Sequence, residues 1–350
     1  MWKWHLLMQV IKWFSWGQER FLHHLRNLQS VINAELDTSA TDWNSITRRA
    51  KHPHCQLPLL EEVTQSAVIL QGPLRRDDDF TLETVRCYRK SMPGARLIVS
   101  TWDTEDASTL LAIEQAGATV VRSSDPDYPG PVNVNRQLRT TQAGIKLAQE
   151  MGCKYVLKTR TDTRMYAFHV LDYLVGLQRS FPLAAGTPQI DRLIVLDFAT
   201  RLLIPNHPSD LLMFGRIEDM TAYWSAPFSY GPDRPPRPRN MLDLWNEQTP
   251  EVYLCESYLQ RIGYPYQRSI ISWWNTLAEL FVVVDRASIE HFWPKYDYSR
   301  DHRAAYDEQV RAMALCSFRE WMNLYTFPKR LDVPEEQVQQ LKCDALVRAA

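Results

Sequence analysis

The sequence predicts an α/β fold: a Rossmann-type, mainly parallel sheet flanked by helices, with a helical N-terminal extension and a helical C-terminal part. Short apolar runs alternate with helical segments between residues 67 and 160, as in a parallel sheet whose two faces are covered. Polar or turn residues directly follow three of these runs, where such sheets bind ligands. The chain has 350 residues, 45% of them hydrophobic, which is enough to bury a full core.

The first half of the sheet is predicted from four strands and the helices between them. Strands are expected at 67–72, 96–102, 119–121 and 154–160, and helices at 81–91, 105–115 and 136–150. A residue that breaks or caps a helix follows each one: Pro93, Gly117 and Gly152 in turn.

The second half of the sheet is predicted from three further strands. These strands are expected at 192–197, 210–215 and 279–284, with helices at 168–179, 218–224 and 250–262 and a loop rich in Pro and Arg at 227–239. We therefore divide the chain into an N-terminal helical extension and linker (1–60), a main domain (61–300) and a C-terminal helical segment (301–350).

Charge and cysteine usage exclude several classes of protein. The chain has 40 Lys and Arg against 41 Asp and Glu, and this formal net charge of -1 gives no field that would attract nucleic acid. The six cysteines are scattered without a CxxC pair, which is typical of reduced thiols in the cytosol. The chain shows neither a cleavable signal pattern nor the run of roughly 20 apolar residues that a spanning helix needs. We expect a cytoplasmic protein.

The predicted helix at residues 1–36 has tryptophans beside lysines. This combination suits a membrane interface, where an indole ring has one wet end and one apolar one. We therefore consider a peripheral contact with the inner membrane. The alternative is a helix packed on the main domain or on a second subunit.

Asp162 directly follows the predicted strand at 154–160 and is the central candidate for a ligand site. A carboxylate at a strand end can hold a divalent cation such as Mg²⁺ or Mn²⁺, which prefers oxygen ligands and takes few of them from the protein. Lys158, Arg160 and Arg164 supply positive charge beside it, although strand alternation lets only some of them face the site. The alternative is an aspartate that caps the following helix.

Several segments in one order resemble the WavE lipopolysaccharide-synthesis family, over roughly residues 63–224. They are Gln71-Gly72-Pro73-Leu74, Pro93-Gly94-Ala95 with Ile98 to Trp102, Asn133-Val134-Asn135-Arg136-Gln137, Tyr155 to Asp162, and Phe214-Gly215 with Glu218-Asp219-Met220. The resemblance implies a GT-A-like glycosyltransferase that acts in building bacterial surface polysaccharide. It also implies that Thr161-Asp162-Thr163 stands where a GT-A enzyme has its DxD motif. The first acid of that motif is missing, and Arg160 could supply part of the positive charge that a cation would otherwise provide.

The resemblance further implies a binding site for a nucleotide-sugar donor, with a UDP-sugar favoured. Its candidate residues follow the strands or open a helix: Gln71, Gly72, Pro73, Arg75, Thr101, Asn135, Arg136, Lys158, Arg160 and Thr161. A helix N-terminus with amides and a guanidinium suits a sugar or phosphate. The alternatives are an ordinary turn after the first strand and a simple helix cap at Asn133.

An inverting transferase also needs a carboxylate that removes the proton of the acceptor hydroxyl. Asp219 is the first choice and Glu218 the second, because both follow Phe214-Gly215; acids also favour the first turn of a helix for electrostatic reasons. Glu256 and Glu251, on the later helix, are the next candidates. His291 follows the last predicted strand and could complete a cation site or contact phosphate, although a lone histidine is more often structural.

These residues together predict sugar transfer from a nucleotide-diphosphate donor to a carbohydrate or lipid-linked acceptor. The alternatives are a nucleotidyltransferase or sugar-phosphate transferase, which also has acids at strand ends, and a non-catalytic assembly factor with the same fold. A P-loop enzyme is excluded because the sequence has no GxxxxGK[ST].

Overall fold

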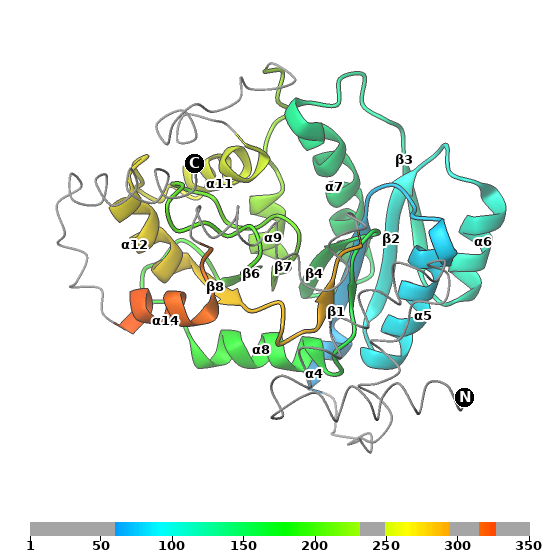
Figure 1. The fold of residues 1–350 in the computed structure, drawn as a ribbon, viewed down its shortest axis with the longest axis horizontal. Coiled ribbons are helices and arrows are strands. Elements are labelled where there is room, and N and C mark those ends of the chain that lie inside the picture. Colours follow the sequence, from blue (N-terminus) through cyan, green and yellow to red (C-terminus); the bar gives the residue numbers. More distant parts are fainter. Residues whose placement is uncertain (1–59, 232–248, 295–314, 327–350) are drawn as a thin grey trace, which may run out of the picture. The chain divides into compact units, whose positions relative to one another are not determined.

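A seven-stranded sheet in the order β3-β2-β1-β4-β7-β6-β8 forms the centre of the protein (Figure 1). The computed structural model describes residues 60–231, 249–294 and 315–326, which all belong to one compact unit, Pro58–Ala350. The predicted extension at 1–60 lies outside these ranges except for its last residue, and so does most of the segment at 301–350. The mixed α/β fold with a mainly parallel sheet is confirmed.

The first four strands are parallel and follow the predicted ranges closely. The elements are α4 (Glu61–Thr64), β1 (Ser66–Gln71), α5 (Phe80–Ser91), β2 (Arg96–Trp102), α6 (Ala107–Gln115), β3 (Thr119–Ser123), α7 (Val134–Glu150) and β4 (Tyr155–Arg160), with short 3-10 turns at Asp77–Asp79 and Pro131–Asn133. β1 pairs with β2 on one side and with β4 on the other, and β3 pairs with β2. β1 is buried along its whole length, which explains its continuous apolar run.

The second half of the sheet contains one reversed strand. Its elements are α8 (Val170–Ser180), β6 (Leu193–Leu196), β7 (Met213–Arg216), α9 (Ile217–Tyr223), α11 (Pro250–Arg261), α12 (Ile270–Leu280) and β8 (Phe281–Val284). β7 is antiparallel to both β4 and β6, whereas β6 and β8 pair in parallel. Residues 197–212 contain no helix, and antiparallel neighbours need none, because only a parallel pair requires a crossover connection.

Helices cover both faces of the sheet. Figure 1 shows α7 and α9 on one face and α5 and α8 on the other. α7 packs on β1, β2 and β3, which follows from its place as the crossover from β3 back to β4. The burial of the strands between these two layers forms one continuous apolar core.

One helix and one short ladder were not predicted from the sequence. α12 is a helix directly before β8, where only the strand was expected, whereas α14 (Phe318–Thr326), which packs on α12 and β8, falls within the predicted helical segment at 301–350. A separate two-stranded ladder joins β5 (Arg164–Met165) to β9 (His291–Phe292). Two-residue strands are too short to show a hydrophobic period. Across residues 60–231, 249–294 and 315–326, no helix has both the length and the apolar character needed to cross a bilayer.

Candidate functional site

The carboxyl ends of β1, β2 and β4 meet at one edge of the sheet, which we call the carboxyl edge. Gln71 is the register partner of Ser100 on β2 and of Arg160 on β4. The backbone then joins the turns after β1 and β4, because the Thr161 amide donates to the Gln71 carbonyl at 3.1 Å. The predicted convergence of these strand ends is therefore present in the structure.

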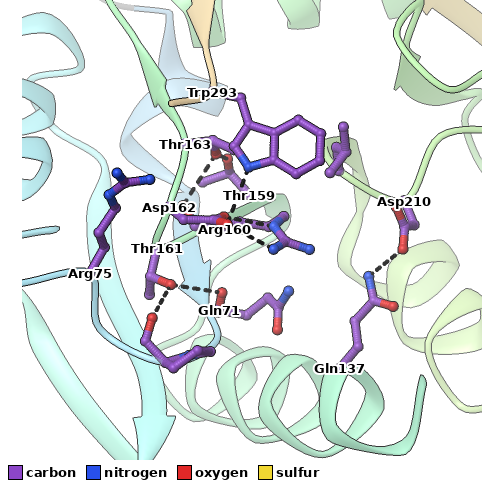
Figure 2. Close-up of polar contacts among 12 residues, drawn as sticks. Gln71, Arg75, Gln137, Thr159, Arg160, Thr161, Asp162, Thr163, Asp210 and Trp293 are labelled. Atoms are coloured by element: carbon purple, nitrogen blue, oxygen red, sulfur yellow. Dashed lines mark hydrogen bonds and ion pairs between the residues drawn. The ribbon is translucent and has the colours of Figure 1, made fainter. Parts of the chain in front are cut away.

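Arg160 and Asp162 form a two-pronged ion pair at this edge. Arg160 Nε lies 2.7 Å from Asp162 Oδ1, and Arg160 Nη2 lies 2.9 Å from Oδ2. Both side chains keep about a quarter of their surface exposed, at 27% and 21%. Trp293 Nε1 donates to Asp162 Oδ2 at 3.2 Å, and its ring lies 5.6 Å from the guanidinium of Arg160 (Figure 2). This geometry fixes the guanidinium in one orientation.

Thr161 ties the turn after β4 to the turn after β1. Its hydroxyl donates to the Pro73 carbonyl at 2.6 Å, and its own carbonyl accepts from the Thr81 hydroxyl at 3.0 Å. Gly72 has φ +115°, and a Cβ there would lie 3.3 Å from Thr161 Oγ1. The glycine therefore serves the close approach of two protein turns, and Thr161 itself is buried.

Arg75 lies on the β9 side of the same edge. Its Nη1 donates to the Pro294 carbonyl at 3.0 Å, and its guanidinium lies 5.6 Å from the Phe80 ring centre. The segment that carries Trp293 and Pro294 is thus held against both turns. Thr101 is fully buried, with its hydroxyl 3.3 Å from the Glu105 carboxylate, so a direct contact with a ligand does not fit its position.

Asn135 and Arg136, at the start of α7, are engaged by other parts of the protein. The Asn135 amide donates to the carbonyls of Tyr128 and Ser229 at 3.1 and 2.8 Å and accepts from the Ser229 amide at 2.7 Å. Arg136 pairs with Asp125, with Nε 2.7 Å from Oδ1. Asn135 thus joins two loops, and the structure does not show it facing the carboxyl edge as predicted. Asn133 forms no side-chain cap on α7.

A second cluster of polar residues at the carboxyl edge, centred on Asp210, was not predicted. Asp210 precedes β7, and the reversed direction of β7 brings it to the carboxyl edge beside β4. Gln137 Nε2, on α7, donates to Asp210 Oδ2 at 2.7 Å, and Lys158 Nζ donates to the Asp210 carbonyl oxygen. Figure 2 shows Gln71, Arg160, Gln137 and Asp210 converging from β1, β4, α7 and the segment before β7. The sequence carried no signal for this, because the direction of β7 depends on tertiary pairing.

Lys158 belongs to this group and does not face a diphosphate. It is completely buried, and its ammonium lies 4.5 Å from the centre of the Trp224 ring. Burial lowers its pKa to about 7, which the nearby Asp210 carboxylate partly opposes. The predicted contact between Lys158 and the donor is therefore corrected: this lysine supports the main chain at Asp210.

Glu251 and His207 lie beside Asp210 in the interior. Burial raises the pKa of Glu251 to about 7, and repulsion from Asp210 adds to that rise. Burial lowers the pKa of His207 to about 3, so the imidazole is neutral, and its Nε2 lies 3.8 Å from Glu251 Oε2. The Glu251 side chain keeps 18% of its surface exposed and lies beside Asp210, so Glu251 stays a candidate for the base role.

Glu218 and Asp219 lie at the opposite edge of the sheet, which we call the amino edge. β7 ends at Arg216, the register partner of Tyr155 at the start of β4, and the Ile217 amide donates to the Lys154 carbonyl. The six residues of β4 therefore separate these acids from Asp162 by roughly 20 Å at about 3.3 Å per residue. The two predicted bases cannot reach an acceptor bound at Asp162. The strand before them, β7, runs opposite to β4, so residues that follow it lie at the other edge of the sheet.

Asp219 instead accepts hydrogen bonds from a loop. Its carboxylate accepts from the Ile190 amide at 3.1 Å and from the Asp191 amide at 3.0 Å. Burial raises its pKa to about 6, against the lowering effect of these two amides. Glu218 is half exposed and lies 3.7 Å from Arg216.

Glu256 is held by other side chains, and His291 lies in the β5–β9 ladder. Glu256 is paired with Arg268 at 2.5 and 2.6 Å and accepts from Asn206 at 3.2 Å, so its charge is already balanced. His291 is buried opposite Met165 in the β5–β9 ladder. Trp293, two residues later, is the residue of this segment that contacts Asp162.

The described residues do not fit a divalent cation on Asp162 in this arrangement. Both of its carboxylate oxygens accept hydrogen bonds from Arg160, and Trp293 donates to one of them. Within residues 60–231, 249–294 and 315–326, no group of three or more His, Cys, Asp or Glu could hold a metal. Arg160 and Trp293 therefore compete with a cation for the oxygens of Asp162.

Comparison with known proteins gives one family. The family model described as WavE lipopolysaccharide synthesis matches residues 66–249, just over half of the chain. No curated protein matches the sequence. Among solved structures, the chain is similar to a cytidylyltransferase from Leptospira borgpetersenii, with 13% identity and a TM-score of 0.31 over 45% of this chain and 63% of that one. The chain thus spans less than two thirds of that protein, and a likeness this weak says nothing about the reaction.

Proposed function

The chain belongs to the WavE lipopolysaccharide synthesis family, and from this premise we propose that it is a glycosyltransferase with a nucleotide-sugar donor. The observation that carries the proposal is the Arg160–Asp162 pair at the carboxyl edge of a sheet whose strands there are parallel. Ligands of open α/β sheets bind beyond this edge. A guanidinium held in a fixed orientation there is suited to phosphate oxygens.

The chemical task of such a site is to stabilise the nucleoside diphosphate as it leaves the sugar. Negative charge develops on the phosphate oxygens during bond cleavage, and a preorganised cation lowers the barrier most when it requires no reorientation. In our proposal Arg160 supplies that charge and Asp162 orients it through two contacts of 2.7 and 2.9 Å. Gln71 is the register partner of Arg160, and Arg75 borders the same edge. We propose that both side chains contact the donor.

We propose a UDP-sugar as donor and a carbohydrate or lipid-linked molecule as acceptor. A cytoplasmic site at the inner membrane would give access to such an acceptor, and the predicted contact for it, the tryptophan-rich helix at 1–36, lies outside the described residues. We propose that Arg160 takes the place of a cation at Asp162, because it donates to both carboxylate oxygens.

The test is nucleotide release by the full-length protein. It is incubated with UDP-, GDP-, CMP- and dTDP-sugars, in EDTA and in Mn²⁺, together with Asp162→Asn and the control Glu150→Gln, an exposed acid at the far end of α7. We expect UDP release that persists in EDTA, is reduced in Asp162→Asn and is unchanged in Glu150→Gln.

Four outcomes would change the proposal. If wild type neither binds nor consumes any donor, the proposed function is wrong. Release of a nucleoside monophosphate from a UDP- or GDP-sugar would identify a sugar-phosphate transferase instead. Binding without turnover would identify a non-catalytic assembly factor. A strict requirement for Mn²⁺ would favour the divalent cation at Asp162 that the sequence predicts over a reaction that uses Arg160 alone.

A further inference from the structure

The carboxyl edge has two aspartates in different surroundings. Asp162 is held by the guanidinium of Arg160 through both of its oxygens. For Asp210, Gln137 is the only side chain among the described residues that donates to the carboxylate, and it bonds Oδ2. The Asp210 carboxylate therefore retains an acceptor oxygen that no cationic side chain of the described part occupies.

Asp210 is fixed in place from two elements. Lys158, on β4, donates to its carbonyl oxygen, and Gln137, on α7, donates to its carboxylate. Arg160 is two residues beyond Lys158 on the same face of β4, which places their Cα atoms roughly 6.6 Å apart. Gln137 is one turn before Thr140, whose hydroxyl donates to the Gln71 amide oxygen at 2.8 Å. These contacts set the carboxylate beside the proposed diphosphate site.

Among the titratable side chains of this group, Asp210 has the fixed carboxylate with an acceptor oxygen left over. Burial and repulsion from Asp210 raise the pKa of Glu251, beside it, to about 7. His207 is neutral and enclosed. Lys158 lies beneath the main chain and contacts a carbonyl oxygen instead of the carboxylate. A group that accepts a proton in a transfer reaction needs this combination of fixed position and free acceptor capacity.

We propose that Asp210 is the general base of the sugar transfer, with Gln137 as its positioning residue; the assignment rests on the proposed function. The acceptor hydroxyl oxygen forms a bond to the anomeric carbon while the bond from that carbon to the diphosphate oxygen breaks. The electron pair of the broken bond leaves with the nucleoside diphosphate, and the hydroxyl proton passes to the Asp210 carboxylate. Attack from the face opposite the leaving group inverts the anomeric configuration.

The experiment compares wild type with Asp210→Asn, Gln137→Leu and the control Glu150→Gln. Asp210→Asn should lower kcat by about 10²- to 10⁴-fold, the usual contribution of general base catalysis. Its dissociation constant for the donor, measured by calorimetry, should stay within about twofold of wild type. Gln137→Leu should lower kcat by about tenfold with the KM for donor unchanged, because the carboxylate remains but loses its orientation. NMR of the product should show the anomeric configuration opposite to that of the donor.

Three results would overturn the assignment while leaving the proposed function intact. They are transfer by Asp210→Asn within about threefold of wild type, a product that keeps the donor's anomeric configuration, or a Gln137→Leu enzyme with unchanged kcat. The last two decide the question even if Asp210→Asn fails to fold. A wild-type protein that neither binds nor consumes any donor would instead overturn the proposed function, and this assignment with it.

Discussion

Each edge of the central sheet carries an aspartate that comes two or three residues after a strand, and the two aspartates have opposite surroundings. Asp162 follows β4 at the carboxyl edge, is partly exposed and is oriented against a guanidinium. Asp219 follows β7 at the amino edge, is buried and accepts hydrogen bonds from backbone amides. The difference comes from strand direction, since β4 and β7 are antiparallel. An acid after a strand indicates a ligand site only when the direction of that strand is known.

The largest expected effect is on donor affinity, which substitutions at the carboxyl edge should lower and a substitution at the amino edge should leave unchanged. Arg160→Ala should weaken binding of the donor by about 100-fold, because hydrogen bonds to a charged group contribute about 1.5–3 kcal/mol. Asp162→Asn should weaken it by about tenfold, since the guanidinium remains but loses its fixed orientation. Asp219→Asn, at the amino edge, should bind donor as wild type does. Calorimetry with a UDP-sugar measures all three.

Equal losses of affinity in Asp162→Asn and Asp219→Asn would contradict this division of the sheet. A global loss of structure would be the other source of equal losses, and circular dichroism of each variant separates the two. Glu150→Gln serves as the control for a charge change at an exposed position.

The second effect concerns stability at the amino edge. In Asp219→Asn the carboxylate becomes a neutral carboxamide with one acceptor oxygen, so the hydrogen bonds from the Ile190 and Asp191 amides weaken, at a cost of about 1–3 kcal/mol. The pKa of Asp219 is about 6 when folded, raised by burial from an ordinary 3.8. The folded protein therefore retains a proton that the unfolded chain releases between these values. The stability linked to that proton is fully present below about pH 4 and is lost as the pH rises through 6.

Urea unfolding at pH 4, 5, 6 and 7 measures this effect. The variant does not titrate at position 219, so the difference in unfolding free energy between wild type and variant should narrow as the pH rises from 4 to 6. A difference that stays constant across this range would contradict the raised pKa of Asp219.

The sequence was sufficient to locate those parts of the site that depend only on neighbouring residues in the chain. The apolar runs of β1, β2 and β4 gave their positions, and the position of Asp162 after β4 followed from them. Asp210 could not be found in this way, because β7 needs pairing on both sides to define its direction. The contact of Trp293 with Asp162 spans 131 positions in the chain and leaves no local pattern. Only a tertiary structure brings such residues together.

The smallest expected effect tests whether the two turns of the carboxyl edge act together. Gly72→Ala should cost about 1 kcal/mol of stability, because alanine is strained at φ +115° and its Cβ would lie 3.3 Å from Thr161 Oγ1. A shift of Thr161 would move the adjacent Asp162, so donor affinity should fall by about threefold. Gly152→Ala is the matched control: Gly152 also has positive φ, +73°, but a Cβ there meets nothing within 4 Å. It should lose similar stability without any loss of affinity, and a loss of affinity in Gly152→Ala as large as that in Gly72→Ala would show that strain alone, and not the contact between the turns, controls donor binding.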